Sequence, residues 1–158
     1  MNPGSDGVEV RQATAADVPQ MALSRGGDPD AGPADPRMTA YLDGRHHPHL
    51  ALAPRAAYLA TVDESVVGYI AGHLTRRYGC AGEVQYLYVN PAFRRSGVAR
   101  TLLGRLAEWF VEEGATRVCV DVNHDSPGAR PFYASRGAQP LRPHWMVWPD
   151  IRSVVVRP

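Results

Sequence analysis

The chain has 158 residues, of which 44% are hydrophobic and 21% are charged, and its formal net charge is +1. This length and composition are typical of a globular domain and exclude a disordered chain. A net charge so close to zero argues against a nucleic-acid-binding protein, and no segment reaches the length of a membrane span. We therefore predict one domain over residues 1–158, with residues 1–7 as a loose tail.

The first quarter of the chain predicts a short strand followed by two short helices. Val8–Arg11 fits a strand, and Thr14 or Asp17 is suited to cap the helix that follows it. Residues 26–36 are rich in Gly, Pro and Asp, which predicts a loop. A short helix is expected at Met38–Leu42.

The middle of the chain predicts three strands and one long helix. Residues 57–62 and 66–74 are strand-like, and the short turn between them predicts a hairpin. A third strand is expected over residues 83–89. Apolar residues then recur at helical spacing, and Gly114 is expected to end that helix. These apolar residues are Val98, Leu102, Leu103, Leu106 and Phe110.

The last quarter predicts a strand at Val118–Val122, a helical stretch that contains Phe132 and Tyr133, and a strand at His144–Trp148. This order of elements favours an α/β or α+β architecture of three layers around one mixed sheet. The His144–Trp148 segment is interpreted as packing in the core or in a homodimer, with the wall of a substrate pocket as the alternative.

The two cysteines, Cys80 and Cys119, are far apart in the sequence and outside any Cys-x-x-Cys arrangement. The N-terminus is polar and shows no signal peptide. Together these features predict a reduced, cytoplasmic protein, with Cys119 as a small buried apolar residue.

The segment Tyr86–Arg100 carries most of the functional information. It consists of an apolar strand, a basic turn and the start of a helix. Gly97 allows the backbone to approach a ligand closely, and the free N–H groups of a helix start bind anions. Arg94, Arg95 and Arg100 add charge suited to phosphate oxygens. The alternative is a surface turn with solvated arginines.

Two ordered motifs resemble those of the GNAT superfamily of acetyl-CoA-dependent N-acetyltransferases. The first is Arg94, Gly97 and Ala99 at the junction of strand and helix. The second follows the next strand and consists of Ser126, Ala129, Phe132-Tyr133 and Gly137. The resemblance extends from about Val8 to Trp148. It implies a GNAT-like three-layer α/β/α fold around a central mixed, mostly antiparallel sheet.

The resemblance also implies a binding site for acetyl-CoA as co-substrate, with no metal. The backbone around Leu87 and Val89 would pair with the pantetheine arm like an added strand. One of those N–H groups would stabilise the oxyanion of the tetrahedral intermediate. The start of the helix would hold the pyrophosphate, and Arg94 would close the turn. The expected coenzyme-binding residues are Leu87, Tyr88, Val89, Arg94, Arg95, Ser96, Gly97, Val98, Ala99, Arg100 and Ser126.

Acetyl transfer to an amine needs a base, because an alkyl amine with a pKa near ~10.4 is protonated at neutral pH. Tyr133 lies where the family commonly places its general acid, with core packing as the alternative role. By the resemblance, Glu83 is the first choice for the base, because it begins the central strand at the position of a catalytic Glu in histone-acetylating members; the alternative is a solvated carboxylate at the end of a strand. Strand alternation predicts that Glu83 shares a face with Leu87 and Val89. Asp121 is the second choice, because some family members place an acidic base on the following strand, and it also interrupts an apolar run in the sequence; the alternative is a structural carboxylate.

Some residues depart from the family pattern. Ser126 stands where Asn is usual, and Ala99 and Ala138 replace the usual Gly and aromatic residue. Pro131 lies inside the expected last helix, where it would cost about 3 kcal/mol, so that helix is expected to begin near Pro131 or to kink there.

Several other polar residues have a simpler interpretation than a catalytic one. His46, His47 and His49 lack the spacing of a metal site and are interpreted as loop. His73 and His124 are interpreted as satisfied polar residues, with an approach to the active site as the alternative. The acidic residues of the early loop are interpreted as solvated side chains, and the alternative is that they attract a cationic amine substrate. They are Asp28, Asp30 and Asp35.

The sequence thus predicts an acyltransferase that moves an acetyl group from acetyl-CoA to a primary amine by direct attack in a ternary complex. The acceptor would be a small-molecule amine or an amine of a peptide or protein. The alternative is a non-catalytic acyl-CoA sensor or a partner-binding module on the same fold.

Overall fold

A computed structural model describes residues 7–25, 37–122 and 128–155. The strands are β1 (Val8–Gln12), β2 (Ala51–Val62), β3 (Ser65–Thr75), β4 (Gly82–Val89), β5 (Val118–Asp121), β6 (Gln139–Arg142) and β7 (Trp145–Trp148). The α-helices are α1 (Val18–Leu23), α2 (Met38–Leu42), α3 (Val98–Glu112) and α4 (Ala129–Ser135). The 3-10 helices are η1 (Ala15–Asp17), η2 (Arg77–Gly79), η3 (Pro91–Phe93) and η4 (Ile151–Val154).

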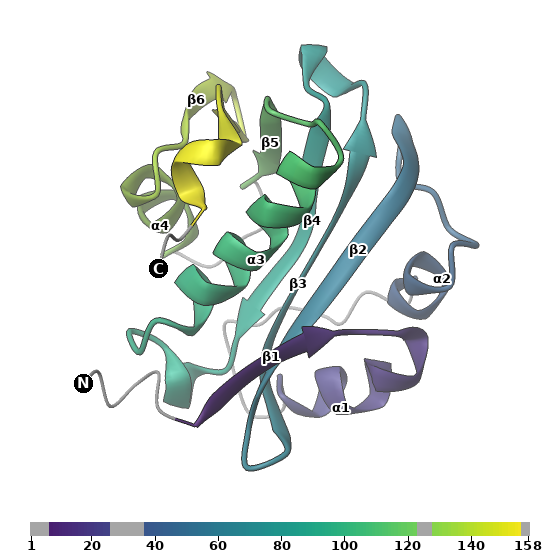
Figure 1. The fold of residues 1–158 in the computed structure, drawn as a ribbon, viewed down its shortest axis with the longest axis vertical. Helices are drawn as coiled ribbons and strands as arrows, with labels where there is room; N and C mark the ends of the chain where they lie inside the picture. Colours follow the sequence, from purple (N-terminus) through teal and green to yellow (C-terminus); the bar gives the residue numbers. More distant parts are fainter. Residues whose placement is uncertain (1–6, 26–36, 123–127, 156–158) are drawn as a thin grey trace.

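The strands form one twisted sheet in the order β1-β2-β3-β4-β5-β7-β6 (Figure 1). Every neighbouring pair is antiparallel except β4 and β5, which run parallel. The helix α3 provides the crossover between these two strands. The sheet is therefore mixed and mostly antiparallel, as the sequence predicted.

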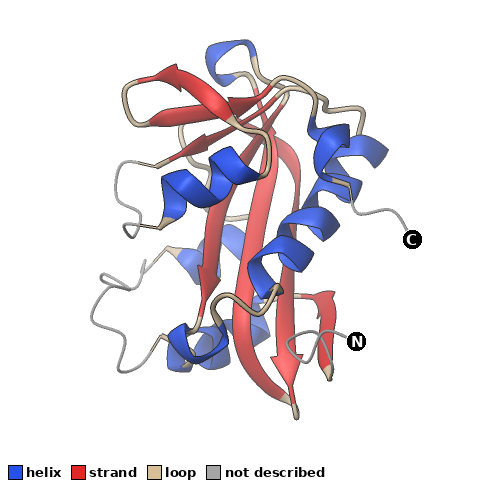
Figure 2. Ribbon diagram, turned by 90° about the vertical axis from the view of Figure 1, so that its left-hand side faces the viewer, coloured by secondary structure: helices blue, strands red, loops and turns tan. Residues whose placement is uncertain are grey.

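Helices cover both faces of the sheet (Figure 2), and each face has its own main hydrophobic cluster. The larger cluster lies between the sheet and α3, and it also includes Tyr133 of α4 and Trp148 of β7. The smaller cluster joins β2, β3 and β4 to Met21 of α1 and to Met38 and Tyr41 of α2. The three-layer α/β/α arrangement is confirmed.

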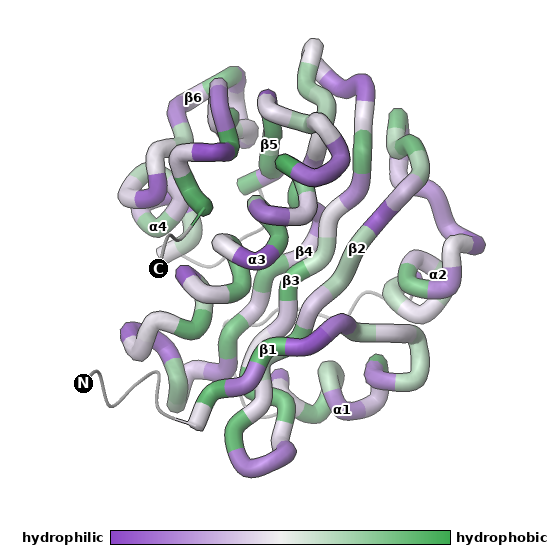
Figure 3. The backbone as a smooth tube through the Cα atoms, in the orientation of Figure 1, coloured by the Kyte–Doolittle hydropathy of each residue, from purple (hydrophilic) through white to green (hydrophobic). Residues whose placement is uncertain are grey.

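The helix α3 packs closely on the sheet because glycines face it. A Cβ on Gly72 would lie 2.8 Å from the carbonyl oxygen of Glu83 and 3.0 Å from Cζ of Phe110. A Cβ on Gly82 would lie 2.5 Å from the Phe110 ring. Along α3 hydrophilic and hydrophobic residues alternate, as expected for a helix with one buried face (Figure 3).

A β-bulge in β4 changes which residues share a face of the sheet. Tyr86 pairs with Ala71 and Val84 pairs with Gly72, so Gln85 has no partner on β3. Because side chains alternate along a strand, the extra residue reverses the alternation on either side of it. Val84, Leu87 and Val89 consequently pack in the larger cluster, whereas Tyr86 and Tyr88 pack in the smaller one.

Most expected elements are present, with differences at their ends. The hairpin of β2 and β3 turns at Asp63 and Glu64, which both have positive φ. The strand β2 begins at Ala51, earlier than expected, and the edge strand β6 has no counterpart in the sequence prediction. Pro131 lies in the first turn of α4, where its missing N–H breaks no helical bond, as predicted. None of the described helices is long and apolar enough to cross a membrane.

Candidate functional site

The turn between β4 and α3 forms an open anion cradle. Gly97 has φ 89° and Arg95 has φ 64°, so the chain turns sharply before the helix begins. The N–H of Thr101 is the first to bond within the helix, to the carbonyl of Gly97. The N–H groups of Val98, Ala99 and Arg100 precede that bond. No side chain caps this end and no acidic residue occupies its first turn, so these N–H groups are available to an anion.

Arginine side chains shape this turn. The Nε of Arg94 donates to the carbonyl of Val89 at 2.9 Å, and its guanidinium lies 5.6 Å from the ring centroid of Tyr88. The hydroxyl of Ser96 donates to the carbonyl of Phe93. Arg94 therefore ties the turn to the end of β4, whereas Arg95 and Arg100 form no ion pair within the described part of the chain.

Beside this cradle, β4 has an open edge. Its parallel pairing with β5 covers only Gly82, Glu83 and Val84. Among the described residues, no strand pairs with the rest of β4 on that side. The two strands thus separate beyond Val84 and leave a length of backbone available to an extended ligand.

The ladder with β3 shows which peptide groups face the open edge. The N–H of Asn90 donates to the carbonyl of Val67 at 2.8 Å, which makes these residues a hydrogen-bonded pair. In an antiparallel ladder such pairs alternate with pairs that do not bond. The peptide groups of Tyr88 therefore bond to β3, whereas those of Leu87 and Val89 point away from β3.

Glu83 lies on the face opposite to the one that the sequence predicted. It pairs with His73 of β3, whose imidazole bonds to Tyr41 of the smaller cluster, so Glu83 faces α2 rather than α3. The prediction that Glu83 shares a face with Leu87 and Val89 was wrong, because the bulge at Gln85 reverses the alternation.

The carboxylate of Glu83 is held through one of its two oxygens. Oε1 accepts a hydrogen bond from Nε of Arg77 at 3.0 Å, and Nε2 of His73 lies 3.7 Å from the same oxygen. Oε2 accepts no hydrogen bond from the described residues. Oε2 is also not fully buried. The described structure has one fully buried side-chain polar atom without a hydrogen-bond partner, and that atom is Nε2 of His73 rather than Oε2 of Glu83.

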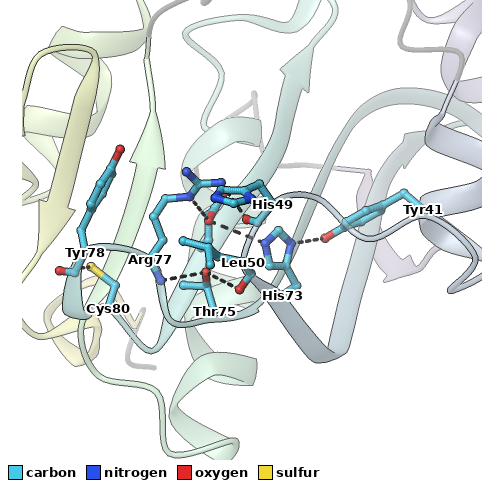
Figure 4. A network of polar contacts seen from close by, with 9 residues as sticks. Tyr41, His49, Leu50, His73, Thr75, Arg77, Tyr78 and Cys80 are labelled. Carbon is cyan, nitrogen blue, oxygen red and sulfur yellow. Dashed lines mark hydrogen bonds and ion pairs between the residues drawn. The ribbon is translucent and has the colours of Figure 1, made fainter.

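Arg77 connects this carboxylate to the surrounding loops (Figure 4). Its Nη2 donates to the carbonyl of His49 at 2.7 Å, and its guanidinium stacks 4.7 Å from the ring centroid of Trp145. Burial opposes the charge of Arg77, but the facing carboxylate of Glu83 outweighs that effect, and the pKa of the guanidinium is raised above its ordinary value. The ion pair therefore favours the charged form of Arg77.

Tyr133 and Asp121 have different environments. Tyr133 is 3% exposed and its ring meets that of Trp148 edge to face, with centroids 5.6 Å apart. It belongs to the larger cluster, so it lies on the face of the sheet opposite to Glu83. Asp121 is the last residue of β5 and is exposed, so the idea of an acidic residue inside an apolar strand does not hold.

The two thiols come together although they are far apart in the sequence. Cys80 and Cys119 are both free and buried, and they share a small cluster with Val147. Interaction with the neighbouring thiol of Cys119 lowers the pKa of Cys80 to about 7, and interaction with Cys80 together with burial raises the pKa of Cys119. The expectation of a buried Cys119 is confirmed.

The histidine-rich segment forms a loop, as predicted. Arg55 donates to the carbonyl of His46 and contacts Nδ1 of His47 at 2.7 Å. The described residues contain no group of three side chains that could hold a metal ion. Some residues singled out in the sequence lie outside the described part of the chain, namely Asp28, Asp30, Asp35, His124 and Ser126.

The end of the segment His144–Trp148, from Met146 onward, packs in the core. Met146 and Trp148 belong to the larger cluster and Val147 to the cluster of the two thiols. His144 has φ 69° and lies in the turn between β6 and β7. The interpretation as core packing accounts for these buried residues.

Comparison with known proteins connects this geometry to one family. The family model described as "Acetyltransferase (GNAT) family" matches residues 27–138. The chain is also similar in structure to an acetyltransferase from Thermus thermophilus, with 20% identity and a TM-score of 0.66 over 89% of this chain and 95% of that one.

Two further solved structures carry ligands. The PaiA N-acetyltransferase from Thermoplasma acidophilum, in complex with coenzyme A, has 16% identity and a TM-score of 0.63 over 89% of this chain and 96% of that one. An aminoglycoside acetyltransferase from an uncultured soil metagenomic sample, in complex with sisomicin, has 15% identity and a TM-score of 0.61 over 83% of this chain and 88% of that one. At these identities the similarity establishes the fold.

Proposed function

This chain belongs to the GNAT acetyltransferase family, and from that premise we propose that it transfers an acetyl group from acetyl-CoA to a primary amine. The amine attacks the thioester directly while both substrates are bound. The acceptor is an amine of a small molecule, a peptide or a protein. We further propose that residues 1–158 act as one catalytic domain in the cytoplasm.

One observation carries the proposal most directly: the open edge of β4 is followed, after η3 and a sharp turn, by the uncapped start of α3. Coenzyme A has a pantetheine arm with two amide groups, followed by a pyrophosphate. The outward peptide groups of Leu87 and Val89 are placed to bond to the amides. The free N–H groups that follow Gly97, with Arg95 and Arg100, are placed to hold the pyrophosphate.

The same edge supplies electrostatic stabilisation to the reaction. An N–H group of Leu87 or Val89 that points at the acetyl carbonyl also faces the oxyanion that forms when the amine attacks. This donor belongs to a strand of the central sheet, so it needs no rearrangement during the reaction. The proposed oxyanion hole, which consists of this N–H donor, is therefore preorganised.

The proposed mechanism assigns the proton transfers to two residues on opposite faces of the sheet, Glu83 and Tyr133. Glu83 removes a proton from the acceptor ammonium through Oε2, directly or through water, and becomes a neutral carboxylic acid. Tyr133 donates a proton to the departing thiolate of coenzyme A, and the tyrosinate that this leaves takes up, directly or through water, the second proton that the attacking nitrogen loses as the amide forms. A thioester held at an open edge can be approached from both faces, which is consistent with their positions in different layers.

The proposal is tested by binding and by turnover. We expect coenzyme A to bind in titration calorimetry, and acetyl-CoA to release its thiol when a suitable amine is present in a panel of amino acids, peptides, polyamines and aminoglycosides. Tyr133→Phe should lower kcat by about 100-fold while the protein still binds coenzyme A. Tyr58→Phe is the matched control, because it removes a hydroxyl from another buried tyrosine of the same cluster.

The other outcomes are equally informative. Binding of coenzyme A without turnover on any amine would favour a non-catalytic acyl-CoA sensor. Absence of coenzyme binding would contradict both functions. Equal loss of kcat in the two tyrosine variants would remove Tyr133 from the mechanism.

A further inference from the structure

His73 is a buried histidine with one satisfied nitrogen and one unsatisfied nitrogen. It lies on β3 directly opposite Glu83 and is 0% exposed. Its Nδ1 contacts the hydroxyl of Tyr41 at 2.9 Å, whereas Nε2 has no hydrogen-bond partner among the described residues. An unsatisfied polar atom in the interior is costly, so its presence needs an explanation other than packing.

The surroundings of the imidazole determine which nitrogen carries the proton. Burial raises the pKa of Tyr41 far above its ordinary value, so its hydroxyl keeps a proton to donate. Donation to Nδ1 leaves the ring proton of His73 on Nε2, where it faces Oε1 of Glu83 at 3.7 Å. In the other tautomer a lone pair would face that carboxylate, which is unfavourable.

We propose that His73, oriented by Tyr41, is a positioning residue that holds the carboxylate of Glu83 in the orientation needed to deprotonate the acceptor. This inference rests on the proposed role of Glu83 as the base. In the proposed arrangement, Nε2 moves from 3.7 Å to hydrogen-bond distance of Oε1. Arg77 and His73 then hold one oxygen together, and the other oxygen stays directed at the acceptor.

The charged and titratable groups around His73 and Glu83 come from five elements. Cys119 of β5 is paired with Glu83, and its thiol and that of Cys80 interact electrostatically with the carboxylate. Glu83 on β4 and Arg77 of η2 face the Nε2 end of His73. At the other end, Tyr41 of α2 is covered by the guanidinium of Arg55 from β2, 4.6 Å from its ring centroid, and by the ring of Tyr86 from β4. An N–H donor at Nε2 favours the ionised form of Glu83. Its removal should therefore move the acidic limb of the rate profile to higher pH.

The test uses a double-mutant cycle between His73 and Glu83. We expect His73→Leu to lower kcat/KM for the acceptor by roughly tenfold, the effect of one hydrogen bond to a charged group, and to shift the acidic limb upward. His73→Gln keeps an N–H donor and should restore most of the rate. In a Glu83→Gln background, measured under single-turnover conditions, His73→Leu should have no further effect.

Tyr41→Phe is a second variant, which removes only the hydroxyl and should shift the limb in the same direction. Tyr69→Phe is its matched control: Tyr69 is buried on the same strand as His73 and packs in the smaller cluster, and its hydroxyl bonds to Arg25 instead. The KM for acetyl-CoA should stay unchanged in all of these variants.

Two results would overturn the inference. One is an additive loss in the Glu83→Gln background, and the other is a uniform loss at every pH with an unmoved limb. If Glu83→Gln itself keeps the full rate, the proposed base fails as well, so failure of the inference and failure of the proposed function are told apart.

Discussion

The ion pair of Arg77 and Glu83 is the most enclosed charge pair of the described structure, with side chains that are 14% and 5% exposed. Removal of one partner leaves the other charge buried and uncompensated. We expect Arg77→Met to lower the free energy of unfolding by about 3 kcal/mol, measured in urea at neutral pH. Arg45→Met breaks an exposed pair with Asp43 and should cost at most about 1 kcal/mol.

Equal stabilities of these two variants would show that the carboxylate of Glu83 reaches water without Arg77.

Of this cluster, the sequence predicted only Glu83 as a functional residue. It could not predict Tyr41 as a partner of His73, because 32 residues separate them and only the sheet register and the packing of α2 bring them together. Nor could it predict which face of the sheet Glu83 occupies, because the order of polar and apolar residues along β4 does not reveal the β-bulge at Gln85.

The contact between α3 and the sheet depends on glycines that leave room for the Phe110 ring. At Gly72, a Cβ would meet the backbone carbonyl of Glu83, which cannot move without separating β3 from β4. We expect Gly72→Ala to lower the free energy of unfolding by about 1–3 kcal/mol. Gly128→Ala is the control, since a Cβ there meets no atom within 4 Å and φ is −87°.

If Gly72→Ala were as stable as Gly128→Ala, the close approach of α3 would not limit the packing.

At the level of elements, strong periodicity gave reliable predictions: α3 and the central strands follow from their apolar spacing. The strand β6 was missed because Gln139–Arg142 is an edge strand with polar residues and a proline, and it pairs only with β7. The early start of β2 was missed because Ala51–Pro54 is largely exposed.

The two larger hydrophobic clusters of the described structure lie on opposite faces of the sheet. The proposed coenzyme site lies along β4, between α3 and α4 on one face, whereas Glu83 and His73 face α2 on the other. In the proposed mechanism, the ligand is reached from both faces where β4 separates from β5, beyond Val84. This placement follows from the parallel pairing of two strands in an otherwise antiparallel sheet.

Coenzyme A should therefore stabilise one side of the molecule more than the other. A ligand at 100 times its Kd stabilises the folded state by about 2.7 kcal/mol, which for this size raises Tm by roughly 5–10 °C. In hydrogen exchange we expect the added protection at residues 87–89 and in the first turn of α3, while the amides of α1 and α2 keep their rates. An unchanged Tm would contradict the binding site. Protection spread evenly over α1 and α2 would show that the ligand stabilises the whole domain rather than the edge of β4.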